Sequence, residues 1–270
     1  MVEISKKYRI GVKRFGLVNW IGSTTLYKKE VQRFLVVWIQ TLLSPIVSSL
    51  LFLLVLSLAI GNTRSNMLGV PFISFLAPGL IAMQIIGGSF NHSASTFMMG
   101  KVQGNIVDIL YAPLSAAEVT LAINLAATTR SFMILIISIF VFYFLIDIEI
   151  KNYYSLIFYV FISSFILGSV GIIAGLWAEK FDNLASITNF LIVPLSFLSG
   201  TFYTIDKLPQ SLQIVSKCNP FFYMIDGMRY SFLLKSDGSI FIGTIYLIVL
   251  AMALWFVSYL LYKKGYKIKS

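Results

Sequence analysis

Long apolar runs separated by short polar connections dominate the chain. Runs such as LFLLVLSLAI and FMILIISIFVFYFL carry no charge and lack the strict alternation that membrane β-strands require. A helix needs about 20 mainly apolar residues to cross a bilayer, and six segments reach that length. The pattern therefore predicts an all-α membrane protein with six transmembrane helices. The predicted spans are 35–60, 70–90, 119–146, 154–178, 185–203 and 240–262.

Composition and charge sharpen this picture. Hydrophobic residues make up 58% of the chain and charged residues 12%, which excludes an ordinary soluble domain. Twelve of the 21 lysines and arginines lie before the first predicted span or after the last. Because basic residues mark the cytoplasmic side and six spans place both ends together, both termini are predicted to be cytoplasmic. The net charge of +10 then favours contact with anionic membrane lipids, not with nucleic acid.

The segment before the first span has a helical pattern of its own. One narrow stripe is formed by Trp20, Thr24, Tyr27, Val31, Phe34 and Trp38. The neighbouring Lys28, Lys29, Glu30 and Arg33 are predicted to point away from this stripe. Such a helix can lie along the lipid headgroup layer with its aromatic side chains buried. The alternative is a simple basic anchor with incidental aromatic residues. The chain thus divides into a cytoplasmic N-terminal segment with an interfacial helix (1–34), a transmembrane domain (35–262) and a basic cytoplasmic tail (263–270).

Candidate chemistry is sparse. Cys218 is the single cysteine and His92 the single histidine, so the sequence predicts no disulfide, no metal ligand set and no catalytic residue. Arg130 lies inside the third span, where it cannot face lipid cheaply. We expect it to face a helix interface, a water-filled cavity or a partner chain, in either a structural or a functional role.

Small residues and prolines predict how the spans pack. Gly168, Gly171 and Gly175 form a smooth face on the fourth span that lets another helix approach closely. Prolines inside the first, second and fifth spans each remove a backbone donor and can bend their helix. These prolines are Pro45, Pro78 and Pro194.

Two connections carry sharper signals. In the cytoplasmic connection 93–119, apolar residues at helical spacing predict a short amphipathic helix that could dock on a cytoplasmic protein; they are Val102, Ile106, Ile109 and Leu110. The external connection before the last span is too long for a turn and too apolar for an open loop. Two short helices that dip back into the outer leaflet would bury its aromatic residues. In the second of them, Asp226 and Arg229 are spaced to form an ion pair.

These features resemble the permease subunits of ABC-2 type exporters. The resemblance rests on the cytoplasmic FMMGKVQGNIVDILYAPLS, on Arg130, on GIIAGLWAEKFDNLASITNFLIVPLSFLSGTFY and on NPFFYMIDGMRYSFL, in this order around six spans. It covers nearly the whole chain, from about residue 27 to 262.

The resemblance implies a mechanism and partners. It implies two permease copies, as a homodimer or a close heterodimer, in the bacterial inner membrane with two separate ABC ATP-binding subunits. The segment that matches the family's coupling helix, which seats on the ATPase, includes Gly100, Lys101, Gln103, Asn105, Ile106 and Asp108. The external signature is matched by Asn219, Pro220, Tyr223, Asp226 and Arg229. The cargo would be a polysaccharide, lipid, drug or ion.

The sequence predicts no nucleotide site on this chain. Gly100-Lys101 is followed by Val102, and Ser95 stands where a phosphate-binding loop begins with glycine. We therefore expect no cofactor on this chain, with ATP and Mg bound by the partner subunit. Two alternatives stay open: an ion-gradient-driven secondary transporter, which the lack of carboxylates deep in the spans disfavours, and an integral membrane enzyme acting on lipid-linked substrates, which would need a convergent polar cluster.

Overall fold

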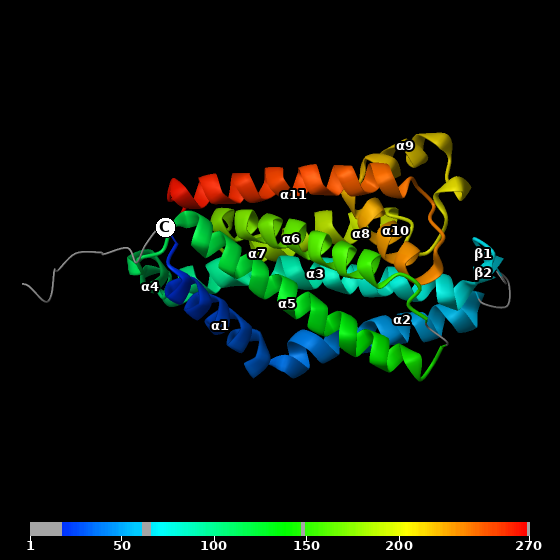
Figure 1. The fold of residues 1–270 in the computed structure, drawn as a ribbon, viewed down its shortest axis with the longest axis horizontal. Coiled ribbons are helices and arrows are strands. Elements are labelled where there is room, and N and C mark those ends of the chain that lie inside the picture. The colour runs from blue at the N-terminus through cyan, green and yellow to red at the C-terminus, as the bar shows by residue number, and fades with distance from the viewer. Residues whose placement is uncertain (1–17, 61–65, 147–148, 269–270) are drawn as a thin grey trace, which may run out of the picture.

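The computed structural model describes residues 18–60, 66–146 and 149–268, and these residues are almost entirely helical (Figure 1). Among these described residues, six helices are long and apolar enough to cross a membrane, which confirms the predicted all-α class and the number of spans. They are Ile39–Ala59, Phe72–Gln103, Ala116–Tyr143, Tyr153–Trp177, Phe181–Leu198 and Ile240–Lys263.

The long helices run along one axis, with α4 at one end and α9 and the two strands at the other (Figure 1). We call these the α4 end and the α9 end. The helices are α1 (Trp20–Val36), α2 (Ser44–Ile60), α3 (Phe72–Gln103), α4 (Ile106–Tyr111), α5 (Ala116–Tyr143), α6 (Tyr153–Trp177), α7 (Phe181–Ile187), α8 (Val193–Leu198), α9 (Gln210–Cys218), α10 (Pro220–Leu233) and α11 (Ile240–Lys263). Two π-helical turns, η1 (Ile39–Leu43) and η2 (Thr188–Ile192), precede α2 and α8, and η3 (Ile205–Lys207) is a 3₁₀ turn. A short antiparallel ladder joins β1 (Asn66–Met67) and β2 (Val70–Pro71).

Helices α3 and α6 form the centre of the bundle. The glycine face on α6 explains their close approach: a Cβ on Gly171 would lie 2.5 Å from the carbonyl oxygen of Phe90. A Cβ on Gly175 would lie 2.7 Å from that of Ala94. The predicted close helix packing of this face is therefore confirmed, with α3 as the partner.

Three spans lie at the periphery and expose most of their side chains: α2 with η1, α7 with η2 and α8, and α11. Between its ends, α11 exposes only apolar side chains, as expected of a helix facing lipid. The α2 span instead exposes Gln40, Ser44 and Ser48, which are four residues apart and lie on one stripe. The η2 turn exposes Asn189. Polar groups on a spanning helix favour a wet or protein-covered face.

The ends of the spans differ from the predicted ones. The first span begins at Ile39, not at residue 35, because the helix of α1 stops at Val36 and the chain turns before η1. The second continues to Gln103, so it includes the first part of the connection predicted to be cytoplasmic. Two short helices, α9 and α10, precede the last span; their entry into the outer leaflet stays a prediction. So do the domain boundaries, and residues 1–17 and 269–270 lie outside the described residues.

Candidate functional site

The predicted coupling segment lies at the α4 end, where α3 turns into α4. Gly104 has a φ of 74° and ends α3 in the left-handed conformation that glycine adopts without strain. The side chain of Lys101 donates to the carbonyl oxygens of Leu176 and Ala178, at 2.5 and 3.1 Å. These carbonyls close α6, so Lys101 ties the end of α3 to the end of α6.

Most polar residues of the coupling segment are exposed, whereas its apolar residue Ile106 is buried. Gln103, Asn105 and Asp108 are exposed, and Asn105 donates to Gln103 at 3.2 Å. Gly100 packs against Ile106, since a Cβ there would lie 3.5 Å from that side chain. The segment is therefore brought together as one compact turn.

The structure contradicts a docking role for Ile106 and Ile109 of α4, whereas docking by this segment as a whole stays a prediction. Ile106 and Ile109 are only 6% and 8% exposed and pack inward, in a cluster that also contains Leu26 and Phe97. Val102 precedes the turn and lies on α3, so the four apolar residues do not share one helix. The apolar side chains exposed on α4 are Val107, Leu110 and Tyr111, of which Tyr111 is 81% exposed, and Asp108 is exposed beside them. Helical spacing alone could not separate the two faces because the helix is only six residues long.

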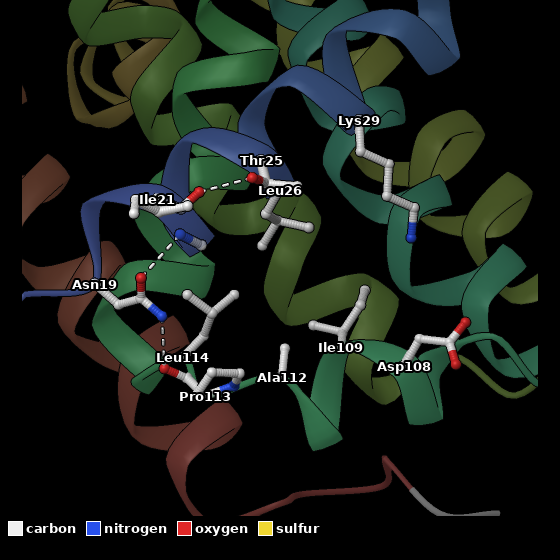
Figure 2. Close-up of a pocket in the computed structure, with 11 residues that line it drawn as sticks. Asn19, Ile21, Thr25, Leu26, Lys29, Asp108, Ile109, Ala112, Pro113 and Leu114 are labelled. Carbon is white, nitrogen blue, oxygen red and sulfur yellow. Dashed lines mark hydrogen bonds between the residues drawn. The ribbon is translucent and has the colours of Figure 1, made fainter. Parts of the chain in front are cut away.

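A groove of about 490 Å³ separates α4 from α1 (Figure 2). One wall comes from α1, and the other from α4 and the residues that follow it. The amide of Asn19 donates to the carbonyl oxygen of Pro113 at 3.2 Å and so closes one end. Lys29 and Asp108 face the groove at its other end, from opposite walls (Figure 2). The groove is thus apolar along its length and charged at one end.

The sequence did not reveal a buried polar cluster between α1 and α3. Glu30 is predicted to point away from the aromatic stripe, but it is only 2% exposed and lies on the buried face of α1 with Phe34 of that stripe. Its carboxylate accepts from Thr96 at 2.8 Å and from Arg33 at 2.9 Å. Arg33 also donates to Ser95 and to the carbonyl oxygen of His92. The spacing of the apolar stripe predicted this helix, but it could not identify which of the polar residues would bind to another helix.

His92 completes this cluster. Its Nε2 lies 3.8 Å from the Glu30 carboxylate, beyond hydrogen-bond distance, and its ring meets that of Phe34 edge to face at 5.6 Å. The stripe predicted on α1 is therefore split: Phe34 is buried in the bundle, whereas Trp20 is 72% exposed. The hydrogen bonds of this cluster join α1 to α3 at residues 92–96, a few turns before α3 ends at the α4 turn.

Arg130 faces a helix interface, one of the places expected for it. It donates to the carbonyl oxygen of Thr41 in η1 at 2.9 Å. Pro45 lies four residues after Thr41 and has no N–H, so this carbonyl lacks its usual helical partner. Arg130 supplies the missing donor. Because Thr41 belongs to the first turns of the first span, Arg130 is level with the beginning of that span and not with its middle.

The external signature lies at the α9 end and centres on a fully buried arginine. Arg229 is 0% exposed, and its guanidinium donates to the carbonyl oxygen of Gly200 at 2.7 Å. It lies 3.9 Å from the ring centroid of Phe75 on α3. The predicted pairing with Asp226 is present, with 3.6 Å between the charged atoms.

Asp226 also accepts hydrogen bonds from the backbone, in addition to its ion pair with Arg229. Its two carboxylate oxygens accept from the backbone amides of Asp237 and Gly238, at 2.8 and 3.0 Å. Asp237 in turn accepts from the amide of Ile205 at 2.7 Å. Partial burial raises the pKa of Asp237. Two carboxylates thus hold the connection after α8 and the connection before α11 against α10.

Asn219 and Pro220 begin α10. The Asn219 side chain accepts from the backbone amide of Phe221. It also donates to the carbonyl oxygen of Leu195 and to the hydroxyl of Ser199, both at 2.8 Å. Pro220 occupies the first helical position, where a missing N–H costs nothing. These residues fix the start of α10 to the end of α8.

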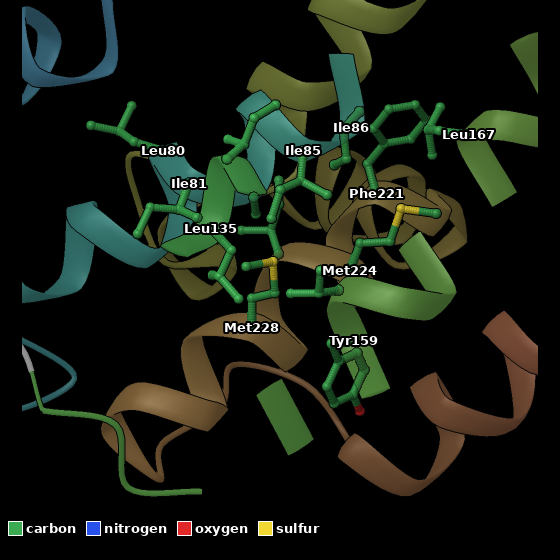
Figure 3. Close-up of a cluster of buried hydrophobic side chains, with 14 of the residues drawn as sticks. Leu80, Ile81, Ile85, Ile86, Leu135, Tyr159, Leu167, Phe221, Met224 and Met228 are labelled. Carbon is green, nitrogen blue, oxygen red and sulfur yellow. The ribbon is translucent and has the colours of Figure 1, made fainter. Parts of the chain in front are cut away.

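Apolar side chains of α10 anchor it in the core (Figure 3). The labelled cluster contains Leu80, Ile81, Ile85, Ile86, Leu135, Tyr159, Leu167, Phe221, Met224 and Met228. Tyr223 lies at the rim, where its ring packs against Gly243 and Tyr246 of α11. The five signature residues therefore surround one junction of α8, α10 and α11, and this junction is remote from the coupling segment.

Among the described residues, no group of three or more histidine, cysteine, aspartate or glutamate side chains could hold a metal ion. Glu118, an acid on α5, is buried but forms the capping box of that helix with Ser115.

Comparison with known proteins decides the family. Residues 23–233 match the ABC-2 type transporter family, which is most of the chain. The chain belongs to the ABC-2 type transporter family. The predicted resemblance is thus confirmed, and the family match together with the six apolar helices identifies the chain as a multi-pass membrane permease.

Individual relatives cover nearly the same region. The inner membrane transport permease YadH of Escherichia coli (strain K12) is 27% identical over 251 residues, which is 93% of this chain and 98% of that protein. A putative transport permease, ycf38 of Cyanophora paradoxa, is 27% identical over 250 residues, with 83% and 82% covered. Nodulation protein J of Neorhizobium galegae is 24% identical over 220 residues, with 79% and 81% covered.

Proposed function

We propose that this ABC-2 family member is the permease subunit of an ATP-driven exporter in a bacterial inner membrane. ATP and Mg would bind to a separate ABC ATP-binding subunit that docks at the α4 end. The location follows that of the YadH relative, an inner membrane transport permease. Both termini and the α4 end would face the cytoplasm, as the basic residues predict.

The outward face of α4 carries this proposal. Val107, Leu110 and Tyr111 form an apolar face of α4 that is 45%, 38% and 81% exposed. At about 1.5 Å per residue, the 32 residues of α3 exceed the roughly 30 Å of a bilayer core, which supports placing α4, at the end of α3, outside the hydrocarbon layer. An exposed aromatic and aliphatic patch outside the membrane is typical of a protein-docking site.

Two permease copies would enclose the pathway. The polar stripe of Gln40, Ser44 and Ser48 on the first span and Asn189 on the fifth are exposed in one chain, whereas α11 exposes only apolar groups at membrane depth. A second copy that covers the α2 and α8 sides would place these polar groups at a shared pathway, and α11 would face lipid. We propose a homodimer, or a close heterodimer, built in this way.

The two alternative functions have specific observations against them. A proton- or ion-coupled carrier needs a carboxylate within its spans, but in the six described spans the acids are Glu118 and Asp182, both in the first turn of their helix. A membrane enzyme would need accessible polar groups. The candidates Asp226 and Arg229 are buried and already bonded to neighbouring backbone groups.

The test is to co-express the tagged chain with each ATP-binding subunit of its own genome that lacks a membrane domain. We expect one such subunit to co-purify in equal amounts with the chain and to hydrolyse ATP in lipid nanodiscs. Replacing the phosphate-loop lysine of that subunit should abolish hydrolysis while the complex stays intact. If the inserted chain retains none of these subunits, the proposal is wrong, and ion-gradient-driven transport becomes the better explanation.

A further inference from the structure

The C-terminal tail (residues 264–268) does not hang free from α11 but folds back at the α4 end. Gly265 has a φ of 66°, and the amide of Tyr266 donates to the carbonyl oxygen of Leu261 at 3.1 Å, so the chain reverses here. Ile268 is only 4% exposed. It joins the same apolar cluster as Ile106 and Ile109, the inward face of α4.

The tail also binds the connection between α6 and α7. Lys267 forms an ion pair with Glu179 at 2.8 Å. The hydrogen bond from Lys267 and its positive charge lower the pKa of the Glu179 carboxyl. Glu179 follows the carbonyls that Lys101 of α3 binds. Three segments that are distant in sequence thus meet beside α4.

A helix as short as α4 needs such support. Six residues form a marginal helix in isolation, so packing of its inward face must fix its position. The cluster that packs on this face includes side chains of α3, α5 and α6, and it is completed by Leu26 of α1 and by Ile268 of the tail. A second groove, of about 450 Å³, lies between α4 and the tail and is lined by Leu110, Lys263 and Ile268 among others.

We propose that the C-terminal tail forms one wall of the surface that receives the ATP-binding subunit and holds α4 in its docking position. This inference rests on the proposed function and adds to it a region outside the coupling segment. Two grooves then flank the outward ridge of α4, one against α1 and one against the tail.

The charges at these grooves indicate the chemistry of the partner. Lys29 lines the first groove and Lys263 the second, and Lys264 is exposed beside it. Asp108 is the acid that lines the first groove. The matching surface of the ATP-binding subunit should therefore present an apolar contact surrounded by acidic side chains. Anionic lipid headgroups would also suit the lysines, but they would not cover the exposed Leu110 and Tyr111.

The test uses the full chain in nanodiscs and the variant Ile268→Asp, with Tyr266→Asp as the matched control because Tyr266 is exposed. Hydrogen–deuterium exchange is measured over residues 104–112 in the chain alone. Affinity for the co-purifying ATP-binding subunit is measured separately. We expect exchange to become faster and affinity to fall, each by about tenfold, since a buried apolar contact is replaced by a charge. Ile268→Leu should keep both at the wild-type level, and Tyr266→Asp should leave the exchange over residues 104–112 unchanged.

Each outcome decides a different point. Unchanged exchange in Ile268→Asp would show that the tail does not hold α4, and unchanged affinity would show that the tail is not part of the docking surface; either result overturns the inference. If exchange rises but affinity depends only on the anionic lipid content of the nanodisc, the tail contacts lipid and the inference is also overturned. If the wild-type chain binds no ATP-binding subunit, the proposed function is contradicted and the docking role of the tail falls with it. The exchange data would still show whether the tail stabilises α4.

Discussion

Buried charge at Arg229 shows how single residues shape this protein. A guanidinium with no exposed surface is tolerated because it meets a carboxylate, a carbonyl oxygen and an aromatic face. Spacing in the sequence was sufficient to predict the pair with Asp226. It could not predict the backbone amides of Asp237 and Gly238, since these approach from a turn whose position depends on the whole fold.

Substitution of this pair tests its coupling. Asp226→Asn or Arg229→Gln alone should lower the free energy of unfolding by about 3–5 kcal/mol, because each leaves a buried charge without its partner. The double variant should lose less than the sum of the two single losses. Thermal unfolding of the detergent-solubilised chain measures all three. Strictly additive losses would show that the two charges do not interact.

Glu30 is the clearest case in which sequence reasoning failed at the residue scale. Its neighbours Lys28 and Lys29 are exposed, as a polar helix face predicts, whereas Glu30 is buried against Thr96. The partner lies 66 residues away, so local periodicity carries no information on it. The identity of the charged residue that turns inward depends on tertiary contacts alone.

At the scale of elements, the sequence predicted the spans well and their ends poorly. Apolar length identifies a crossing helix because every backbone group there must be bonded within the helix. The ends depend on local turns instead: η1 displaces the start of the first span, and α3 continues past the predicted end of the second span and stops at Gly104. The glycine face of α6 was predicted correctly because small residues act through size alone.

The contact of α3 with α6 gives a matched pair of variants. Gly171→Ala should lower the free energy of unfolding by about 1–3 kcal/mol, since its methyl group would press on the carbonyl of Phe90. Gly87→Ala on α3 is the control, because no atom lies within 4 Å of the added Cβ. It should be neutral or stabilising by up to about 1 kcal/mol through helix propensity. Equal effects in the two thermal unfolding curves would contradict close packing at Gly171.

At the scale of the whole molecule, a single chain exposes polar side chains on two sides of its bundle of spans. The α2 side and the α7–α8 side expose polar and aromatic residues together, whereas α11 presents an even apolar surface. Composition indicated a membrane protein and family resemblance implied pairing. Neither could indicate which surfaces remain uncovered, because exposure is a property of the assembled bundle.

Cysteine cross-linking tests the arrangement of two copies. In a Cys218→Ser background, Phe190→Cys should form a disulfide between copies in native membranes, because Phe190 is 84% exposed on the proposed shared side. Phe241 on α11 is 75% exposed, and Phe241→Cys should form no cross-link between copies, since it would face lipid. Cross-linking at Phe241 without cross-linking at Phe190 would place the interface on α11 and contradict the arrangement.

The central claim is that the outward face of α4 binds a separate ATP-binding subunit. Tyr111→Ala removes the most exposed side chain of that face without touching the inward Ile106 and Ile109. Tyr143→Ala, which alters a 68% exposed tyrosine at the far end of α5, is the control. The decisive measurement is the affinity of each variant, in nanodiscs, for the co-purifying ATP-binding subunit. A loss of about tenfold or more in Tyr111→Ala, with Tyr143→Ala unchanged, is predicted for an exposed aromatic anchor at an interface. Wild-type affinity in Tyr111→Ala, with α4 still folded, would contradict the claim.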